Sequence, residues 1–366
     1  MTVYGFGALS TTQTIPWIKE NGFDAMQQGF LLASVALFTI GLQIVFGVLS
    51  DRTAKMKLYF LIVYAGALAA SVWMYFQKIS SFWLMFVLIG GIGGACRCYQ
   101  SMIDTWVLES SNASSEFEKD KAIGSVGWAL GAWLAALLLN WLHFSALGWA
   151  CALCGIAALS LCLKLKDVER QSTMKWSQLK QLATNKEYVV LVLIMLVLFS
   201  MGCADIYLVV DKMMSLGGTS FHVGLKWGLQ SLAEAPVFLI SKKLLERFQM
   251  IPLLMFSTLM FGVRFLIYGF VQNVWILVLC SLMQSVTFPI AIYCTKIGID
   301  QCTDEEIKST SQLAGASIYM GISLLVMPVL TTWLASCFNQ DIALFCVAGC
   351  SVFALYLIQV YRKINS

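Results

Sequence analysis

The sequence predicts an all-α integral membrane protein with twelve transmembrane helices arranged as two six-helix repeats. Of its 366 residues, 59% are hydrophobic and 12% are charged, and the mean hydropathy is +0.78. A soluble domain is about half apolar and about a quarter charged, so it could not bury this much apolar surface. Apolar runs of about 20 residues, enough to cross a ~30 Å hydrocarbon core as a helix, recur along the chain. Long strands of alternating polar and apolar residues are absent, which argues against a transmembrane β-barrel.

Twelve apolar runs define the expected spans. They cover residues 4–18, 29–50, 58–79, 82–108, 120–142, 145–163, 188–214, 222–241, 250–271, 273–298, 309–336 and 342–361. The first run is short for a bilayer, and Lys19 and Glu20 follow it directly. We expect that the native start lies upstream and that the first half of helix 1 is missing. A cleaved signal peptide is a poor alternative, because no basic region precedes the run.

The loops alternate in basic content, which predicts the orientation. One set carries Arg52, Lys55 and Lys57; Lys119 and Lys121; Lys164, Lys166, Arg170, Lys175, Lys180 and Lys186; Lys242, Lys243 and Arg247; Lys296 and Lys308; and Arg362 and Lys363. The opposite loops offer only Lys19 and Lys78. Because cytoplasmic loops are rich in Lys and Arg, both termini are expected on the cytoplasmic side of the cell membrane. The net charge of +4 then reflects topology, and no nucleic-acid partner is expected.

The longest polar connection follows the sixth span and divides the chain into two halves. We expect an N-terminal six-helix half over 1–164, a cytoplasmic linker over 165–187 and a C-terminal six-helix half over 188–366. The stretch Phe46 to Ser50, which precedes a charged loop, is echoed by Phe238 to Ser241. Parallel repeats of this kind form transporters whose halves rock about a site at the membrane midplane.

The loop after the second span has a recognisable pattern. It reads GVLSDRTAKMK from Gly47 to Lys57 and resembles the signature of the major facilitator superfamily. Gly47 would allow two helices to approach closely, and Asp51 would accept hydrogen bonds from a neighbouring helix end. With Arg52 and Lys57 it would form a conformational latch. The alternative interpretation is an ordinary basic cytoplasmic loop.

The fourth span places charge inside the membrane. Gly90, Gly94, Arg97, Ser101 and Asp104 recur at steps of four and three, which puts them on one helical face. A charged side chain at a helix centre costs ~2.5–3.5 kcal/mol, so each one calls for a partner or a purpose. We expect Arg97 and Asp104 to line a substrate cavity. An internal Arg97–Asp104 ion pair is the structural alternative.

The fifth span contains the most specific motif. The segment EFEKDKAIGSVGWAL resembles the lactose permease-like branch of oligosaccharide and nucleoside proton symporters. The resemblance implies that Trp128 stacks on a sugar ring and that Ser125 lies beside it. It also implies that Lys121 replaces an arginine of the branch and Asp104 its glutamate partner. Lysine lacks the bidentate fork of arginine, so recognition of the solute would differ. An interfacial lysine and a packing tryptophan are the alternatives.

The eighth and ninth spans carry the expected proton-coupling residues. Lys226, Gln230 and Glu234 recur at steps of four, and Arg264 aligns with an arginine that the branch uses in proton coupling. We expect Gln230 to bind substrate and Glu234 to carry the proton, with Arg264 approaching it in one conformation. A static Glu234–Arg264 pair is the alternative.

The tenth and eleventh spans depart from that branch. Gln284, Thr287 and Met320 stand where the branch has a histidine, a glutamate and a lysine. Gln284 is therefore assigned to substrate binding. Two aspartates remain as alternative proton carriers. Asp205 has Lys212 as its expected basic neighbour, and Asp104 has Arg97.

Metal binding and catalysis are not predicted. Nearly all of the 12 cysteines lie inside apolar spans, where they are small packing residues. Cys151 and Cys154 have no histidine near them, so neither a metal nor a cofactor is expected. His143 and His222 are the two histidines, and neither H-E-x-x-H nor G-x-S-x-G occurs, so an enzyme is not expected.

Together these features predict a secondary active transporter. It would move a small polar solute, a sugar or a nucleoside, by alternating access with symport of protons, as a monomer in the lipid bilayer. The alternative within transport is a drug or metabolite exporter, which 23 Phe and 17 Met would also suit. From another class, a receptor or scaffold would show no counterflow of any solute.

Overall fold

The computed structural model describes residues 1–53, 55–110, 114–165, 167, 181–303 and 307–365. Regular structure in these ranges is helical, and no strand occurs among them. The first part of the chain forms α1 (Thr2–Thr11), α2 (Thr14–Glu20), α3 (Ala25–Thr53), α4 (Met56–Phe76), α5 (Phe82–Ser110), α6 (Ser114–Trp141) and α7 (Phe144–Leu163).

The second part begins with α9 (Lys186–Ala204), η1 (Asp205–Val209), α10 (Val210–Ser215), α11 (Ser220–Phe248) and α12 (Met250–Phe270). It continues with α13 (Val274–Cys280), η2 (Ser281–Val286), α14 (Phe288–Cys302), α15 (Lys308–Cys337) and α16 (Gln340–Ile364). We refer to α1–α7 as the N-terminal helices and to α9–α16 as the C-terminal helices.

Ten of the expected spans have the length and hydropathy of membrane-crossing helices within the described residues. The other two expected spans differ for separate reasons. The first is split into α1 and α2 around Thr12 and Gln13, and the eighth, α11, is made more polar by Lys226, Gln230 and Glu234. The chain is therefore a multi-pass membrane protein, and the two exceptions are the spans with a helix break or with internal charge.

Two helices change their hydrogen-bonding pattern inside the membrane region. The segment from Asp205 to Val209 is a π-helix between α9 and α10, and the segment from Ser281 to Val286 is a 3₁₀-helix between α13 and α14. Pro289 lies in the first turn of α14, where its missing N–H costs little, so a new helix begins there. Departures of this kind inside helices are frequent at functional sites.

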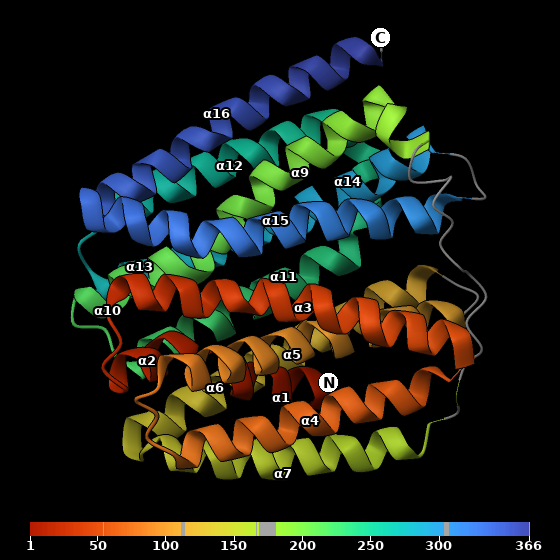
Figure 1. Ribbon diagram of the computed structural model, residues 1–366. Helices are drawn as coiled ribbons and strands as arrows, with labels where there is room; N and C mark the ends of the chain where they lie inside the picture. Colours follow the sequence, from red (N-terminus) through yellow and green to blue (C-terminus); the bar gives the residue numbers. More distant parts are fainter. Residues whose placement is uncertain (54, 111–113, 166, 168–180, 304–306, 366) are drawn as a thin grey trace.

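The N-terminal and C-terminal helices occupy different parts of the bundle (Figure 1). Two helix pairs join them side by side, α6 with α11 and α3 with α15. The end of α7 and the start of α9 lie at one end of the bundle, which we name the linker end; the opposite end, which includes residues 20–25, 215–220 and 337–340, is the distal end. The described parts of the basic loops predicted to be cytoplasmic therefore lie at the linker end.

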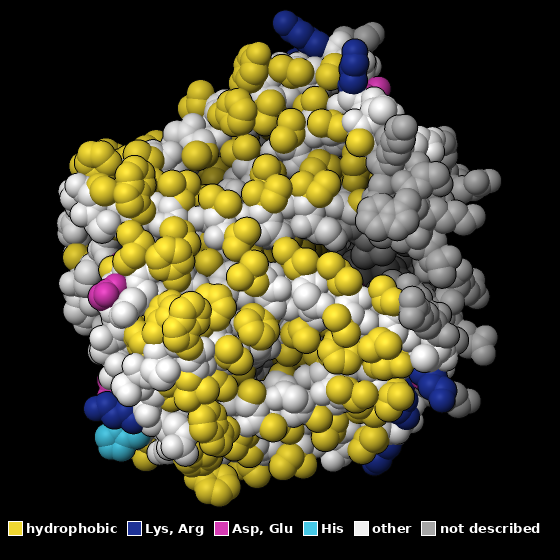
Figure 2. Space-filling view, in the orientation of Figure 1, with side chains coloured by type: hydrophobic (Ala, Val, Ile, Leu, Met, Phe, Trp, Pro, Cys, Tyr) yellow, Lys and Arg dark blue, Asp and Glu magenta, His cyan; other side chains and the backbone are white. Residues whose placement is uncertain are grey.

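The outer surface suits a lipid environment. Large apolar side chains such as Trp83, Leu153 and Phe270 are more than two-thirds exposed. Figure 2 shows hydrophobic side chains over most of one face, with charged side chains near the edges of the view. A water-soluble monomer rarely exposes apolar surface on this scale, whereas hydrocarbon tails would cover it.

Small residues let the N-terminal helices approach closely. A Cβ atom at Gly94 would lie 2.8 Å from the backbone nitrogen of Thr39 in α3. A Cβ atom at Gly127 would overlap the carbonyl of Met1, and one at Gly131 would overlap the carbonyl of Gly5. Gly94 therefore sets the α3–α5 contact, and Gly127 and Gly131 set the contact between α1 and α6.

The expectation for Gly47 is wrong. A Cβ atom there would meet nothing within 4 Å, so close approach of a helix does not require this glycine in the observed conformation. Lys57 instead binds the end of α7, because its Nζ donates to the carbonyls of Leu163 and Leu165 at 2.7 Å each. The side chains of Asp51 and Arg52 lie outside the described part of the chain.

Candidate functional site

A buried carboxylate with two cationic partners lies among the C-terminal helices. Asp205, the first residue of the π-helix, is 1% exposed. Its Oδ2 accepts a hydrogen bond from Lys226 Nζ at 2.8 Å, and its Oδ1 accepts one from Arg264 Nη2 at 2.9 Å. Both cations are fully buried. The two ion pairs therefore connect η1 with α11 and with α12.

Arg264 extends these contacts in two directions. Its Nε donates to the Tyr268 hydroxyl at 2.9 Å, and its Nη1 donates to Gln284 Oε1. Gln284 Nε2 then donates to Glu234 Oε1 at 2.8 Å. In this conformation Arg264 and Glu234 are therefore connected through the Gln284 amide, and a direct approach of Arg264 in another conformation stays a prediction. Gln284 lies in the 3₁₀ segment, which aims its side chain at both partners.

The charges of this network balance when both carboxyls are ionised. Lys226 and Arg264 supply two positive charges, and Asp205 and Glu234 supply two negative ones. Protonation of Glu234 would leave one positive charge in excess. Because a buried charge is costly without compensation, each of these four charges stabilises the others.

The expected pairing of Asp205 with Lys212 is wrong. Lys212 instead pairs with Asp341 at 2.6 Å and donates to the carbonyl of Tyr268 at 2.6 Å. Lys212 lies seven residues after Asp205, beyond the π-helix, and the extra residue in that helix rotates the start of α10. The Lys212 side chain therefore connects α10 with α12 and α16.

A second polar group lies among the N-terminal helices. Asp104 of α5 accepts hydrogen bonds from Lys121 Nζ of α6 at 2.6 Å and from the Tyr4 hydroxyl of α1 at 3.0 Å. The Asp104 and Lys121 side chains are each about one-third exposed, at 31% and 30%. The predicted Asp104–Lys121 pair is thus present in the structure, and three helices meet at it.

Arg97 does not pair with Asp104, contrary to the structural alternative considered for it. Its guanidinium interacts with the hydroxyl of Tyr207, which belongs to η1 among the C-terminal helices. Seven residues, or about two turns, separate Arg97 from Asp104 on α5, so the two side chains reach different neighbours. Arg97 therefore joins the two groups of helices across the centre of the bundle.

The remaining predicted substrate residues, Ser125, Trp128 and Gln230, belong to the two helices α6 and α11, which lie side by side. The Ser125 carbonyl accepts a hydrogen bond from the Ser231 hydroxyl at 3.0 Å. Trp128 is half-buried and packs against the apolar core. Gln230 is buried, and its Oε1 has no hydrogen-bond partner in the described residues. An unsatisfied buried amide oxygen is costly, so Gln230 is a candidate to accept a bond from a bound solute.

The sequence patterns missed three tyrosines. Tyr268 stands four residues after Arg264, so helical periodicity could have placed it on the same face. Tyr4 belongs to the short first apolar run, which offered no pattern, and Tyr207 lies inside the π-helix. No periodic signal marks either of these two positions. Each is fixed by a contact between helices far apart in the sequence.

Contacts between the two groups of helices close the distal end. Lys19 of α2 forms an ion pair with Asp211 of α10, with Nζ and Oδ1 2.5 Å apart. Gln13 Nε2, at the break between α1 and α2, donates to the Ser220 carbonyl of α11 at 3.2 Å. A Cβ atom at Gly224 of α11 would lie 2.6 Å from the Ala132 carbonyl of α6.

Comparison with known proteins identifies the family. The model of the MFS_1 like family matches residues 6–333 of the chain. The chain belongs to the MFS_1 like family. It is a transporter of the major facilitator superfamily, as the loop between α3 and α4 and the helix motif of α6 suggested.

Relatives and solved structures agree with this family. The MFS_1 like chain is 20% identical to the maltose permease of Geobacillus stearothermophilus over 322 residues, covering 87% of this chain and 81% of that protein. It is 28% identical to the lactose permease of Citrobacter freundii over 162 residues, covering 42% of this chain and 38% of the relative.

Two solved structures share the fold. A structure of the nucleoside transporter NupG superposes with a TM-score of 0.80 at 14% identity, covering 99% of this chain and 97% of that one. The human organic anion transporter MFSD10 (TETRAN) superposes with a TM-score of 0.68 at 13% identity, covering 98% and 97%. At these identities the likeness concerns the fold alone.

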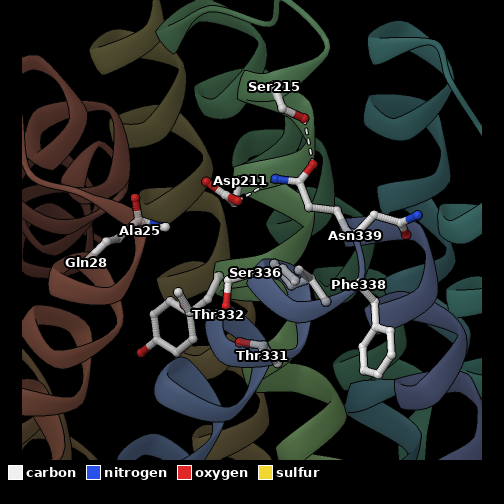
Figure 3. A pocket seen from close by; sticks show the side chains of 13 residues that line it. Ala25, Gln28, Asp211, Ser215, Thr331, Thr332, Ser336, Phe338 and Asn339 are labelled. Carbon is white, nitrogen blue, oxygen red and sulfur yellow. Dashed lines mark hydrogen bonds between the residues drawn. The ribbon is translucent and has the colours of Figure 1, made fainter.

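This MFS_1 like transporter has a polar pocket at its distal end, apart from the two central polar groups. The pocket has a volume of about 390 Å³ and lies between α3, η1, α10, α15 and the start of α16. Figure 3 shows Asp211 and Ser215 on one side, both bonded to the Gln340 side chain, and Gln28 on the other.

Proposed function

We propose that the chain is a secondary active transporter that moves a small polar solute, a sugar or a nucleoside, across the cytoplasmic membrane by proton symport. The names of the relatives, maltose permease and lactose permease, and of the structural neighbour, a nucleoside transporter, support this solute class. Both termini face the cytoplasm, since the basic loops gather at the linker end. The protein acts as a monomer.

The observation that carries the proposal is the buried network of Asp205, Lys226, Arg264, Gln284 and Glu234. Each charge inside a membrane helix costs ~2.5–3.5 kcal/mol, and such charges mark substrate and proton pathways. Apolar side chains at the same positions would pack the helices without the cost of burying charges. The network therefore supports coupled transport, with Glu234 as the proton carrier and Arg264 and Asp205 as its charged partners.

The solute site is placed between the two groups of helices. Ser125 lies at the α6–α11 contact, with Trp128 on the same helix α6 and Gln230 on α11. Lys121, which pairs with Asp104, lies one to two turns before Ser125 and Trp128 on α6. Arg97 of α5 and Gln284 of η2 are the other two residues assigned to solute binding, one from each group of helices. Hydroxyl groups of a sugar would bind the amide and charged side chains, while its apolar face would stack on the Trp128 indole.

Alternating access is supported by the asymmetry of the bundle. The halves are residues 1–164 and 188–366, joined by the linker 165–187. The Lys19–Asp211 ion pair and the Gln13–Ser220 hydrogen bond both lie at the distal end, which is consistent with a conformation closed on that side. In the proposed cycle these contacts break while contacts at the linker end form, with Asp51, Arg52 and Lys57 as the latch there.

We expect Trp128→Ala to weaken solute binding by ~1–3 kcal/mol, or about 5- to 150-fold in Kd, because the ring stack is lost. Trp128→Phe should lose less, since an aromatic face remains. Binding of maltose, lactose and uridine to purified protein is measured by equilibrium dialysis. Trp149→Ala is the matched control, because Trp149 is 64% exposed on α7, far from the α6–α11 contact. Unchanged affinity in Trp128→Ala would make this tryptophan a packing residue.

The direction of transport is tested in the same preparation. Proteoliposomes with an imposed proton gradient should accumulate the solute in the direction of proton flow. Accumulation against that direction would indicate the exporter that the composition also allows. Absence of counterflow for every solute tried would contradict transport altogether.

We expect Lys19→Met and Asp211→Asn each to change the uptake rate by up to ~5-fold. The reason is that a partly exposed ion pair contributes ~0–1 kcal/mol to the closed distal end. The two side chains are 33% and 21% exposed. The charge swap Lys19→Asp with Asp211→Lys should restore uptake to near the original rate. If the swap is as impaired as the single variants, the ion pair does not act as a gate.

A further inference from the structure

The side-chain amide of Gln28 lines the distal pocket. Gln28 of α3 is 3% exposed, and its side chain has no hydrogen-bond partner among the described residues. Figure 3 shows its amide pointing into the pocket toward Asp211. An amide has two N–H donors and a carbonyl acceptor, and those of Gln28 are directed at the space that a ligand in the pocket would fill.

The opposite wall is polar but already neutralised. The Asp211 carboxylate is paired with Lys19 and also accepts a hydrogen bond from Gln340 Nε2 at 2.5 Å. Asp211 is the charged residue among the side chains that line the pocket, and the others with polar atoms carry hydroxyls or amides. Because Lys19 already balances Asp211, a cationic ligand would find no unpaired carboxylate in this wall, and an anionic ligand would be repelled by Asp211. The wall therefore favours a neutral ligand with several hydroxyl groups.

The size and the location of the pocket fit such a ligand. Its volume of about 390 Å³ lies in the ~300–1,000 Å³ range of small-molecule sites. Tyr207 lines the pocket and also interacts, through its hydroxyl, with Arg97 at the centre of the bundle. One buried side chain thus separates the distal pocket from the residues assigned to the central solute site.

We propose that the distal pocket is a second, outer binding site for a neutral polyhydroxylated solute, with the Gln28 amide as its main polar contact. The inference rests on the proposed function, since the solute is the one that the protein transports. Tyr207 and Arg97 form the partition between the two sites. A solute held in the outer site passes inward when this partition and the Lys19–Asp211 pair open.

Complete binding isotherms with radiolabelled maltose, lactose and uridine test the proposal on the purified full chain in lipid nanodiscs. The wild-type protein should bind two solute molecules per chain. Gln28→Leu, which keeps the shape but removes the amide, should leave one molecule per chain. Gln43→Leu is the matched control, because Gln43 lies on the same helix about four turns away, outside the pocket, and should leave both sites.

The remaining site identifies which one was lost. In Gln28→Leu the site that remains should be the central one, so adding Trp128→Ala should lower its affinity for the solute. Binding at this remaining site also shows that the Gln28→Leu variant is folded. One molecule per chain in the wild type, unaffected by Gln28→Leu, would overturn the outer site and leave the proposed function standing. Two molecules per chain in Gln28→Leu would also overturn it. Binding of none of the three solutes would contradict both proposals.

Discussion

Asp205→Asn is expected to lower the free energy of unfolding by ~3–5 kcal/mol, because it removes one partner of buried charges and leaves the other uncompensated. Lys226 and Arg264 both bind this carboxylate, and neither is exposed. Asparagine has almost the same shape, so loss of packing would not explain the change. The unfolding midpoint in detergent measures the effect. Asp120→Asn, at an exposed position of α6, is the matched control.

A double variant separates charge from geometry. Asp205→Asn combined with Lys226→Met removes one negative and one positive charge, so Arg264 and Glu234 again balance. We expect the double variant to be more stable than Asp205→Asn alone, which gives a coupling energy between the two positions. A midpoint for Asp205→Asn equal to that of Asp120→Asn would show that the carboxylate is not needed to stabilise the two cations.

Glu234→Gln is expected to abolish solute-driven proton movement while preserving solute counterflow. Glutamine keeps an oxygen that can accept the hydrogen bond from Gln284 Nε2, now 2.8 Å from Glu234 Oε1, so the local structure should persist. It cannot take up or release a proton. Solute counterflow and the pH change that a solute gradient drives are measured together in proteoliposomes.

Glu246→Gln is the matched control for this variant, since Glu246 is exposed on the same helix near the linker end. It should change neither readout. Unchanged proton movement in Glu234→Gln would transfer the role to Asp205, to Asp104 or to another cation. Loss of both proton movement and counterflow would make Glu234 part of solute binding.

Much of the fold was predictable because the membrane imposes it. Runs of about 20 apolar residues, alternating basic loops and one long polar connection predicted the order of the helices along the chain. The same rule identified the internal charges, since Arg97, Asp104, Lys226, Glu234 and Arg264 stand out against an apolar background. These features belong to single segments, so a single sequence reveals them.

The partners of those charges were less predictable. Periodicity places Asp104 and Arg97 on one face of their own helix, but it does not say which helix faces them. Asp104 therefore paired with Lys121 as the resemblance implied, whereas Arg97 reached Tyr207 on another part of the chain. The Lys212 expectation failed because a π-helix, which no composition signal marked, rotates the residues after Asp205. The hydrogen bonds of Gln284 to Arg264 and Glu234 depend on a 3₁₀ segment, which no composition signal marked either.

The close contact at Gly224 has a consequence for the resting state of the protein. A methyl group at this position would meet the Ala132 carbonyl at 2.6 Å and could be accommodated only if α6 and α11 moved apart at the distal end. In the proposed alternating-access cycle, every 1.4 kcal/mol of such steric cost would change the ratio of the two conformations about tenfold. The size of one side chain, without any change in charge, would then decide which side of the membrane the empty protein faces.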